Sequence, residues 1–205
     1  MDITGLILRS VDVGEYDKIL TIATPERLYS VRAKSVRKPL SKLKGSVGVL
    51  TFGEFSLTEG RNGYLLSGTN PTELFGNCWT DPDRYGAAMF CLELFEKCER
   101  NGEKLNFFEL VRALSEINYG EVYPPTVALK FGVECAVEVG VDVTEGVFPA
   151  DVGAVFSALL SAEQAEGVLS DATESDIKKC MMHLAAGFKA ELGIVLTVAI
   201  EIFRS

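Results

Sequence analysis

Residues 47–69 read VGVLTFGEFSLTEGRNGYLLSGT, and this stretch decides the fold. Two short apolar runs, 47–58 and 64–69, flank the segment EGRNG. Because Arg61, Asn62 and Gly63 are typical of a hairpin turn, the stretch predicts two strands joined directly to each other. No helical period interrupts either run, so the region is all β.

Three more strands are predicted before this hairpin, over residues 3–13, 19–23 and 28–36. On the third of them, side chains alternate with period two. One face then holds Tyr29, Val31 and Ala33, and the other holds Ser30, Arg32 and Lys34. Five short strands within about 70 residues predict a small closed barrel, because closure removes free sheet edges. An SH3-like barrel would show the same pattern, so periodicity leaves the barrel type open.

Glycines punctuate the strand region, and Gly45, Gly48 and Gly53 fit sharp bends within its strands. From residue 80 the period becomes helical. Three helix starts are predicted from caps: Asp81 with Pro82, Asn106 with Glu109 as a capping box, and Thr173 with Asp176. Pro124 and Pro125 predict the start of a helix that ends near Val139. A further helix is predicted from Val152 to Leu160. The run IVLTVAIEIF (194–203) fits either a strand or a buried helix.

These patterns predict an α+β chain with a five-stranded barrel domain over residues 1–78 and an all-α domain over residues 79–205. The chain has 205 residues, 47% hydrophobic and 24% charged, which excludes disorder. No stretch has the length and hydropathy of a membrane span or a signal peptide. We therefore expect a soluble, cytoplasmic protein that contacts no membrane.

Cysteine and histidine usage argues against metal sites and nucleophilic catalysis. The five cysteines are spread out, none forms a Cys-x-x-Cys pair, and they are expected to be buried apolar residues in a reducing compartment. A single His183 offers neither a ligand pair nor a base for several candidate nucleophiles. Glu15 and Asp17 are expected to accept backbone N–H groups or face solvent. We predict no cofactor and no enzymatic activity.

Charge is distributed unevenly along the chain. The net charge is −9, but residues 1–75 carry ten Lys or Arg against eight Asp or Glu, whereas the remainder carries ten against twenty-one. Residues 27–44 contain seven cations and no acid. Because potentials decay within about 8 Å at physiological salt, this local run matters more than the total charge.

The basic run favours nucleic-acid binding once it is placed on a small barrel, whose faces and loops commonly hold single strands. Arg32 and Lys34 should share a strand face, while the connection RKPLSKLKG should bring more cations to the same phosphate track. Tyr29, Phe52, Phe55 and Tyr64 are possible stacking platforms, although each fits the core better. The predicted DNA contacts are Arg27, Arg32, Lys34, Arg37, Lys38, Lys42, Lys44 and Arg61.

Residues 1–75 also resemble the RecO family of bacterial recombination mediators. The resemblance is carried by GLILRSVDVGEYDKILTIATPERLYSVRAKSVRKPLSKLKG and FGEFSLTEGRNGYLLSGTNPTEL, and continues more weakly to about Val141. It implies an N-terminal OB fold, a helical C-terminal domain, and binding of single- and double-stranded DNA with strand annealing. It further implies contact with the C-terminal tail of single-strand DNA-binding protein, cooperation with RecR in loading RecA, and a nucleoid location.

Two departures from that family pattern matter. Many members carry a four-cysteine zinc site, whereas TEGVFPADVGAVF contains neither Cys nor His, so zinc is expected to be absent. Members often have basic residues after a Leu-Gly pair, but Leu192 and Gly193 are followed by the uncharged IVLTVAI. The alternative function is an adaptor that binds acidic peptides and has little DNA affinity. A hydrolase or transferase has the least support.

Overall fold

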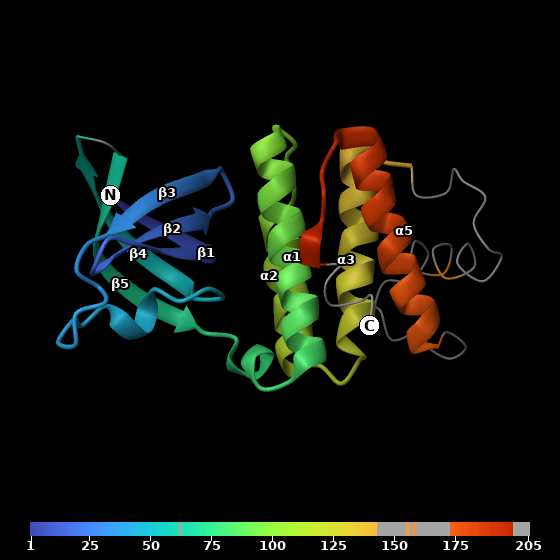
Figure 1. The fold of residues 1–205 in the computed structure, drawn as a ribbon, viewed down its shortest axis with the longest axis horizontal. Coiled ribbons are helices and arrows are strands. Elements are labelled where there is room, and N and C mark those ends of the chain that lie inside the picture. Colours follow the sequence, from blue (N-terminus) through green and yellow to red (C-terminus); the bar gives the residue numbers. More distant parts are fainter. Residues whose placement is uncertain (62, 143–154, 156–157, 159–172, 199–205) are drawn as a thin grey trace. The chain divides into compact units, whose positions relative to one another are not determined.

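The computed structural model describes residues 1–61, 63–142, 155, 158 and 173–198, and it divides into the compact units Met1–Phe75 and Gly76–Ser205 (Figure 1). The first unit contains five strands: β1 (Asp2–Val13), β2 (Asp17–Ala23), β3 (Leu28–Ala33), β4 (Phe52–Gly60) and β5 (Gly63–Glu73). They form a closed barrel in the order β1-β2-β3-β5-β4.

The pairing pattern identifies the barrel as an OB-type fold. Neighbouring strands are antiparallel except β3 and β5, which pair in parallel at Val31↔Tyr64 and Arg32↔Leu65. Strand β1 closes the barrel by pairing with β4 as well as β2. This confirms the predicted α+β class with a five-stranded N-terminal barrel and decides the barrel type that periodicity left open.

The barrel core follows the alternation predicted for β3. Tyr29, Val31 and Ala33 are buried, and the side chains between them are exposed. The inward side chains pack with residues from the other four strands, among them Ile7, Leu20, Ile22, Phe55, Leu57 and Leu66. Burial of this apolar surface is the main stabilising contribution to a unit of this size.

Two predicted strand boundaries are wrong, and left-handed backbone explains both. Strand β3 ends at Ala33 because Ser35 adopts φ 56°, and β4 begins only at Phe52 because Leu50 adopts φ 68°. An extended strand cannot pass through a positive φ. Gly45 and Gly48 therefore lie outside the strands, with Gly45 in the short helix η1 (Lys44–Ser46).

Gly53 does lie within a strand, where it faces Gly5 across the β1–β4 seam. A Cβ atom on Gly53 would lie 2.7 Å from Pro71 Cα and 2.9 Å from Thr72 N, and it would also meet the carbonyl oxygen of Asn70. All three atoms belong to the backbone of β5, which cannot move without opening the barrel. The close approach of three strands at this seam thus requires glycine.

The second unit is a bundle, and the four long helices among its described residues lie roughly parallel to one another (Figure 1). They are α1 (Pro82–Asn101), α2 (Phe107–Tyr119), α3 (Pro124–Val139) and α5 (Glu174–Leu192). Helix α1 packs against both α2 and α3, and α3 also packs against α5. Phe90, Cys91 and Leu94 are fully buried, in agreement with the predicted central position of α1.

Most predicted helix caps are confirmed. Asp81 accepts the N–H of Arg84, and Thr173 and Asp176 form a complete capping box. At Asn106 the side chain accepts the N–H of Phe108 at 3.0 Å, but the N–H of Asn106 donates to Glu138 at 3.2 Å. The predicted capping box with Glu109 is therefore wrong.

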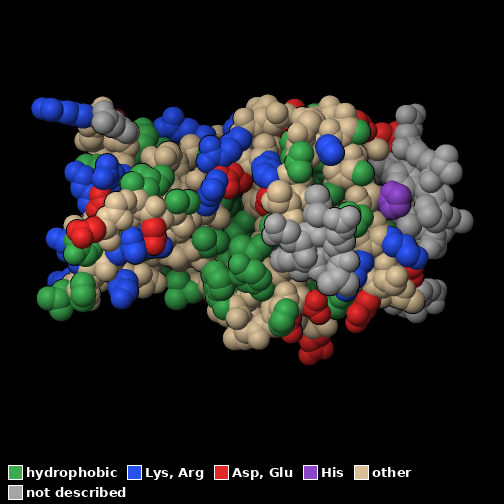
Figure 2. Space-filling view, in the orientation of Figure 1, with side chains coloured by type: hydrophobic (Ala, Val, Ile, Leu, Met, Phe, Trp, Pro, Cys, Tyr) green, Lys and Arg blue, Asp and Glu red, His purple; other side chains and the backbone are tan. Residues whose placement is uncertain are grey.

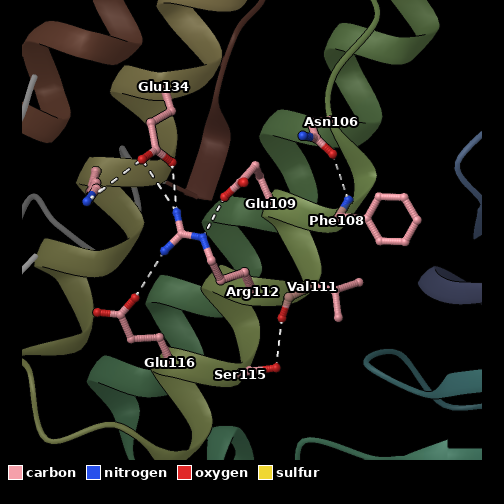
Figure 3. A network of polar contacts seen from close by, with 9 residues as sticks. Asn106, Phe108, Glu109, Val111, Arg112, Ser115, Glu116 and Glu134 are labelled. Carbon is pink, nitrogen blue, oxygen red and sulfur yellow. Dashed lines mark hydrogen bonds and ion pairs between the residues drawn. The ribbon is translucent and has the colours of Figure 1, made fainter. Parts of the chain in front are cut away.

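Glu109 instead belongs to an ion-pair network that joins α2 to α3 (Figure 3). Arg112 contacts Glu109, lies 3.5 Å from Glu116, and reaches across to Glu134 on α3 at 3.1 Å. One guanidinium thus contacts three carboxylates. For Glu109, the charge-assisted contact with Arg112 is stronger than a hydrogen bond from the N–H of Asn106 would be. The network joins the two helices through one guanidinium, and its three carboxylates outnumber that cation.

The C-terminal run ambiguous in sequence is not a strand where it is described. Residues 193–196 have no regular structure, Thr197 and Val198 are helical, and Ile194 and Leu196 are buried. Glu93 on α1 accepts the backbone N–H groups of Thr197 and Val198 at 2.9 and 2.8 Å. A carboxylate at a helix N-terminus stabilises that end. The helix predicted over 152–160 lies outside the described residues except for Val155 and Ala158, which are helical.

Candidate nucleic-acid interface

A groove of about 340 Å³ lies on the outside of the barrel, between β2, β3 and the β4–β5 hairpin. Its apolar lining includes Ile19 and Leu65, and its polar lining includes Ser30, Arg32, Lys34 and Arg61. We call this the barrel groove. An apolar base with a cationic rim has the chemistry to hold a nucleobase and the phosphates beside it.

Strand alternation explains the β3 side of the groove. Because Tyr29, Val31 and Ala33 point into the core, Arg32 and the following Lys34 must point outward. Arg61 approaches from the other side, at the tip of the β4–β5 hairpin, where Gly63 adopts φ 111°. Only glycine reaches that conformation freely, which confirms a turn at the predicted position. Asn62 lies outside the described residues.

Arg32 is already paired within the barrel. Its Nε and Nη2 lie 2.9 and 2.7 Å from Asp17 Oδ2, and Asp17 Oδ1 accepts the N–H of Ser35 at 2.8 Å. The Ser35 N–H group and then the Arg32 guanidinium lower the pKa of Asp17 below its usual value. Asp17 therefore accepts a backbone N–H as expected, and it also offsets one cation of the groove.

Two other predicted cations turn toward the loop between β1 and β2. Arg37 Nε lies 3.2 Å from Asp12 Oδ2, and its Nη1 donates to the carbonyl of Gly14 at 3.3 Å. Lys38 Nζ lies 5.4 Å from the centre of the Tyr16 ring, a cation–π arrangement. These contacts fix the start of the basic connection against the barrel wall.

Arg27 makes aromatic contacts. It lies 4.4 Å over the ring of Tyr29 and donates to the hydroxyl of Tyr64 at 3.2 Å, and these two tyrosines stack edge to face at 5.4 Å. Tyr29 and Phe55 are buried and so cannot act as stacking platforms, while Phe52 and Tyr64 are half-buried.

Lys42 and Lys44 are exposed on the connection between β3 and β4. Within the described part of the chain, Arg27, Lys34, Lys38, Lys42, Lys44 and Arg61 form no ion pair with a carboxylate. Six of the eight predicted contacts thus keep their charge available for phosphate.

The structure brings together three of the eight predicted residues, namely Arg32, Lys34 and Arg61, around the barrel groove. The other five lie outside this groove, and the connection that follows Lys34 runs toward the opposite end of the barrel from the β4–β5 tip (Figure 1). On the face seen in Figure 2, the Lys and Arg side chains of the barrel lie in several groups rather than in one row. The apolar lining by Ile19 and Leu65 was not anticipated, although both occupy outward positions in predicted strands.

The described residues offer little support for metal binding, membrane insertion or cysteine chemistry. These hold no group of three or more His, Cys, Asp or Glu side chains that could bind a metal ion, and none of their helices is long and apolar enough to span a membrane. All five cysteines are buried, and burial raises the pKa of Cys98 to about 12. Burial also raises the pKa of Cys91 and Cys135, so these three thiols are protonated at neutral pH.

Comparison with known proteins gives a family match over the same residues that form the barrel. Residues 1–75 match the family described as recombination protein O N terminal. Through this domain the chain is similar to the RecO family. Its relatives include the DNA repair protein RecO of Roseiflexus sp. (strain RS-1), 33% identical over 118 residues, which are 57% of this chain and 42% of that protein.

Two further RecO relatives give the same picture. The protein of Heliobacterium modesticaldum is 35% identical over 108 residues, covering 52% of this chain and 40% of the relative. That of Alkaliphilus metalliredigens is 31% identical over 131 residues, covering 62% and 53%. The chain thus matches about half or less of the length of these curated relatives.

Proposed function

We propose that this chain is a DNA repair and recombination mediator of the RecO family that binds DNA through the barrel. The observation that carries the proposal is the barrel groove, where Lys34 and Arg61 flank an apolar surface without a carboxylate partner among the described residues. Phosphates bound there would release counterions, which is the main source of nucleic-acid affinity. An unstacked base would cover Ile19 and Leu65, which favours single strands in the groove.

Cations outside the groove suit a second strand. Lys42 and Lys44 lie on the connection between β3 and β4, do not line the barrel groove, and form no ion pair with a described carboxylate. Two separated cationic surfaces can lower the repulsion between two phosphate backbones while the bases remain free to pair. We therefore propose binding of both single- and double-stranded DNA, with annealing of complementary strands and no bond-making step.

The partners are proposed from the family resemblance, namely RecR, the C-terminal tail of single-strand DNA-binding protein and, indirectly, RecA. The helical unit has a second hollow of about 380 Å³ lined by Lys97, Arg100, Asn101, Ile194 and Val195. Its two cations are paired, Lys97 with Glu93 at 2.6 Å and Arg100 with Glu96 at 2.8 Å. An acidic peptide would therefore have to compete with these carboxylates while its apolar end covers Ile194 and Val195. The basic residues that follow the Leu-Gly pair in many members are absent, but Ile194 and Val195 supply apolar surface there.

Annealing of complementary oligonucleotides coated with single-strand DNA-binding protein tests this function. We expect the chain to accelerate annealing, and to do so less when the coating protein lacks its C-terminal tail. Equal rates with both coating proteins would contradict the tail contact. No acceleration on either coated or bare strands would contradict the DNA function itself.

The pairing of Arg32 with Asp17 and of Arg37 with Asp12 favours one alternative, an adaptor for acidic peptides with little DNA affinity. An acidic peptide and an oligonucleotide would compete for the same cations. The adaptor predicts that the peptide binds at physiological salt while an oligonucleotide at the same concentration does not. The DNA-binding function predicts the reverse order of affinity.

A further inference from the structure

Asp17 occupies an unusual place for a carboxylate, directly behind the cationic rim of the barrel groove. It begins β2, and it receives Nε and Nη2 of Arg32 on one oxygen and the N–H of Ser35 on the other. Only 19% of its side chain is exposed, against 48% for Arg32. The carboxylate is therefore held against the Nε and Nη2 edge of the Arg32 guanidinium, and Arg32 itself lines the groove.

Asp17 is an anion over the whole physiological range. The N–H of Ser35 and the Arg32 guanidinium lower its pKa, and the nearby charge of Lys34 acts in the same direction. A guanidinium that already shares two N–H groups with a carboxylate presents a nearly neutral pair to an incoming phosphate. Arg32 then contributes less to phosphate binding than Lys34 or Arg61 does.

We propose that Asp17 is an internal competitor for phosphate, which lowers the affinity of the barrel groove for DNA and makes binding readily reversible. The inference rests on the proposed DNA-binding function. Weak, rapidly reversible contact suits a protein that brings two strands together, because each strand must be released once its bases have paired. Asp17 acts through Arg32 and sets the strength of the site.

Asp17→Asn tests the competition with a near-isosteric change. The asparagine carbonyl can still accept the N–H of Ser35, while the negative charge is lost. Freeing one cation adds about one phosphate contact, so the slope of log affinity against log salt should steepen by about 0.7 for single strands. At 0.1 M salt this corresponds to about fivefold tighter binding of a labelled single-stranded oligonucleotide.

Glu15→Gln is the matched control, because Glu15 is exposed in the β1–β2 loop two residues before Asp17 and forms no ion pair with the described residues. It changes the net charge equally and should shift the affinity less than twofold. A gain in Glu15→Gln as large as in Asp17→Asn would show a general charge effect and overturn the proposal. Unchanged binding in Asp17→Asn would also overturn the proposal. Weaker binding in Asp17→Asn would overturn it as well, because it would show that Asp17 positions Arg32 for DNA.

The double variant Asp17→Asn/Arg32→Gln keeps the proposal falsifiable if the single variant does not fold, as judged by circular dichroism and thermal melting. It replaces the nearly neutral Asp17–Arg32 ion pair with two uncharged side chains, so the affinity for the oligonucleotide should remain within twofold of the wild type. A fivefold loss would show that Arg32 already contributes its full charge. Absence of oligonucleotide binding by the wild type at low salt would instead remove the proposed function itself.

Discussion

Replacing Lys34 and Arg61 together with alanine is expected to weaken binding of a single-stranded oligonucleotide about 25-fold at 0.1 M salt. Both side chains line the barrel groove, both are exposed, and neither forms an ion pair with a described carboxylate. Each phosphate contact on a single strand adds about 0.7 to the salt exponent, so two lost contacts remove about 1.4. Fluorescence anisotropy at several salt concentrations measures both quantities.

The control is Lys104→Ala/Lys189→Ala, which lowers the net charge by the same amount on the helical unit, where Lys104 is paired with Glu99 at 2.9 Å and Lys189 is exposed. We expect it to leave the affinity within about twofold of the wild type. If this control and Lys34→Ala/Arg61→Ala lost affinity equally, binding would follow the total charge, and the barrel groove would not be the site.

Gly53→Ala is expected to destabilise the barrel by about 3 kcal/mol, the upper part of the range for an overpacked site. The added methyl would lie 2.7 Å from Pro71 Cα and 2.9 Å from Thr72 N, where no flexible side chain can yield. Gly5 faces Gly53 across the seam, so β1 must shift as well. Urea denaturation followed by tyrosine fluorescence should report a lower midpoint for the barrel transition.

Gly45→Ala provides the comparison, because a Cβ at Gly45 meets nothing within 4 Å and its φ is not positive. We expect its stability to lie within about 0.5 kcal/mol of the wild type, as for most surface substitutions. A Gly53→Ala protein as stable as Gly45→Ala would show that the β1–β4 seam can open without cost, contrary to the barrel described above.

Local patterns in the sequence were sufficient to predict the elements of the fold. Alternation along 28–33 separates the buried Tyr29 and Val31 from the exposed Arg32, because strand geometry fixes side-chain direction regardless of the partner strand. Caps at Asp81 and Thr173 likewise depend only on neighbouring backbone. The strand ends were missed at Ser35 and Leu50, since a non-glycine residue with positive φ leaves little trace in sequence.

The candidate site depended on contacts between distant residues, and these could not be predicted. Arg61 reaches Arg32 and Lys34 only because β5 pairs in parallel with β3, a crossing that periodicity does not reveal. Asp17 was correctly expected to accept a backbone N–H, but its pairing with Arg32 requires the β2–β3 register. A basic run in sequence therefore identified the cations without showing which of them share a groove.

The salt dependence of single-stranded oligonucleotide binding tests the central claim most directly, namely that the cationic barrel binds the phosphate backbone. Phosphates engaged by Lys34 and Arg61 of the barrel groove predict a slope of about −1.4 for log affinity against log salt, and each further cation that the same strand contacts adds about 0.7 to its magnitude. A slope near zero, or no binding at low salt, would contradict the claim.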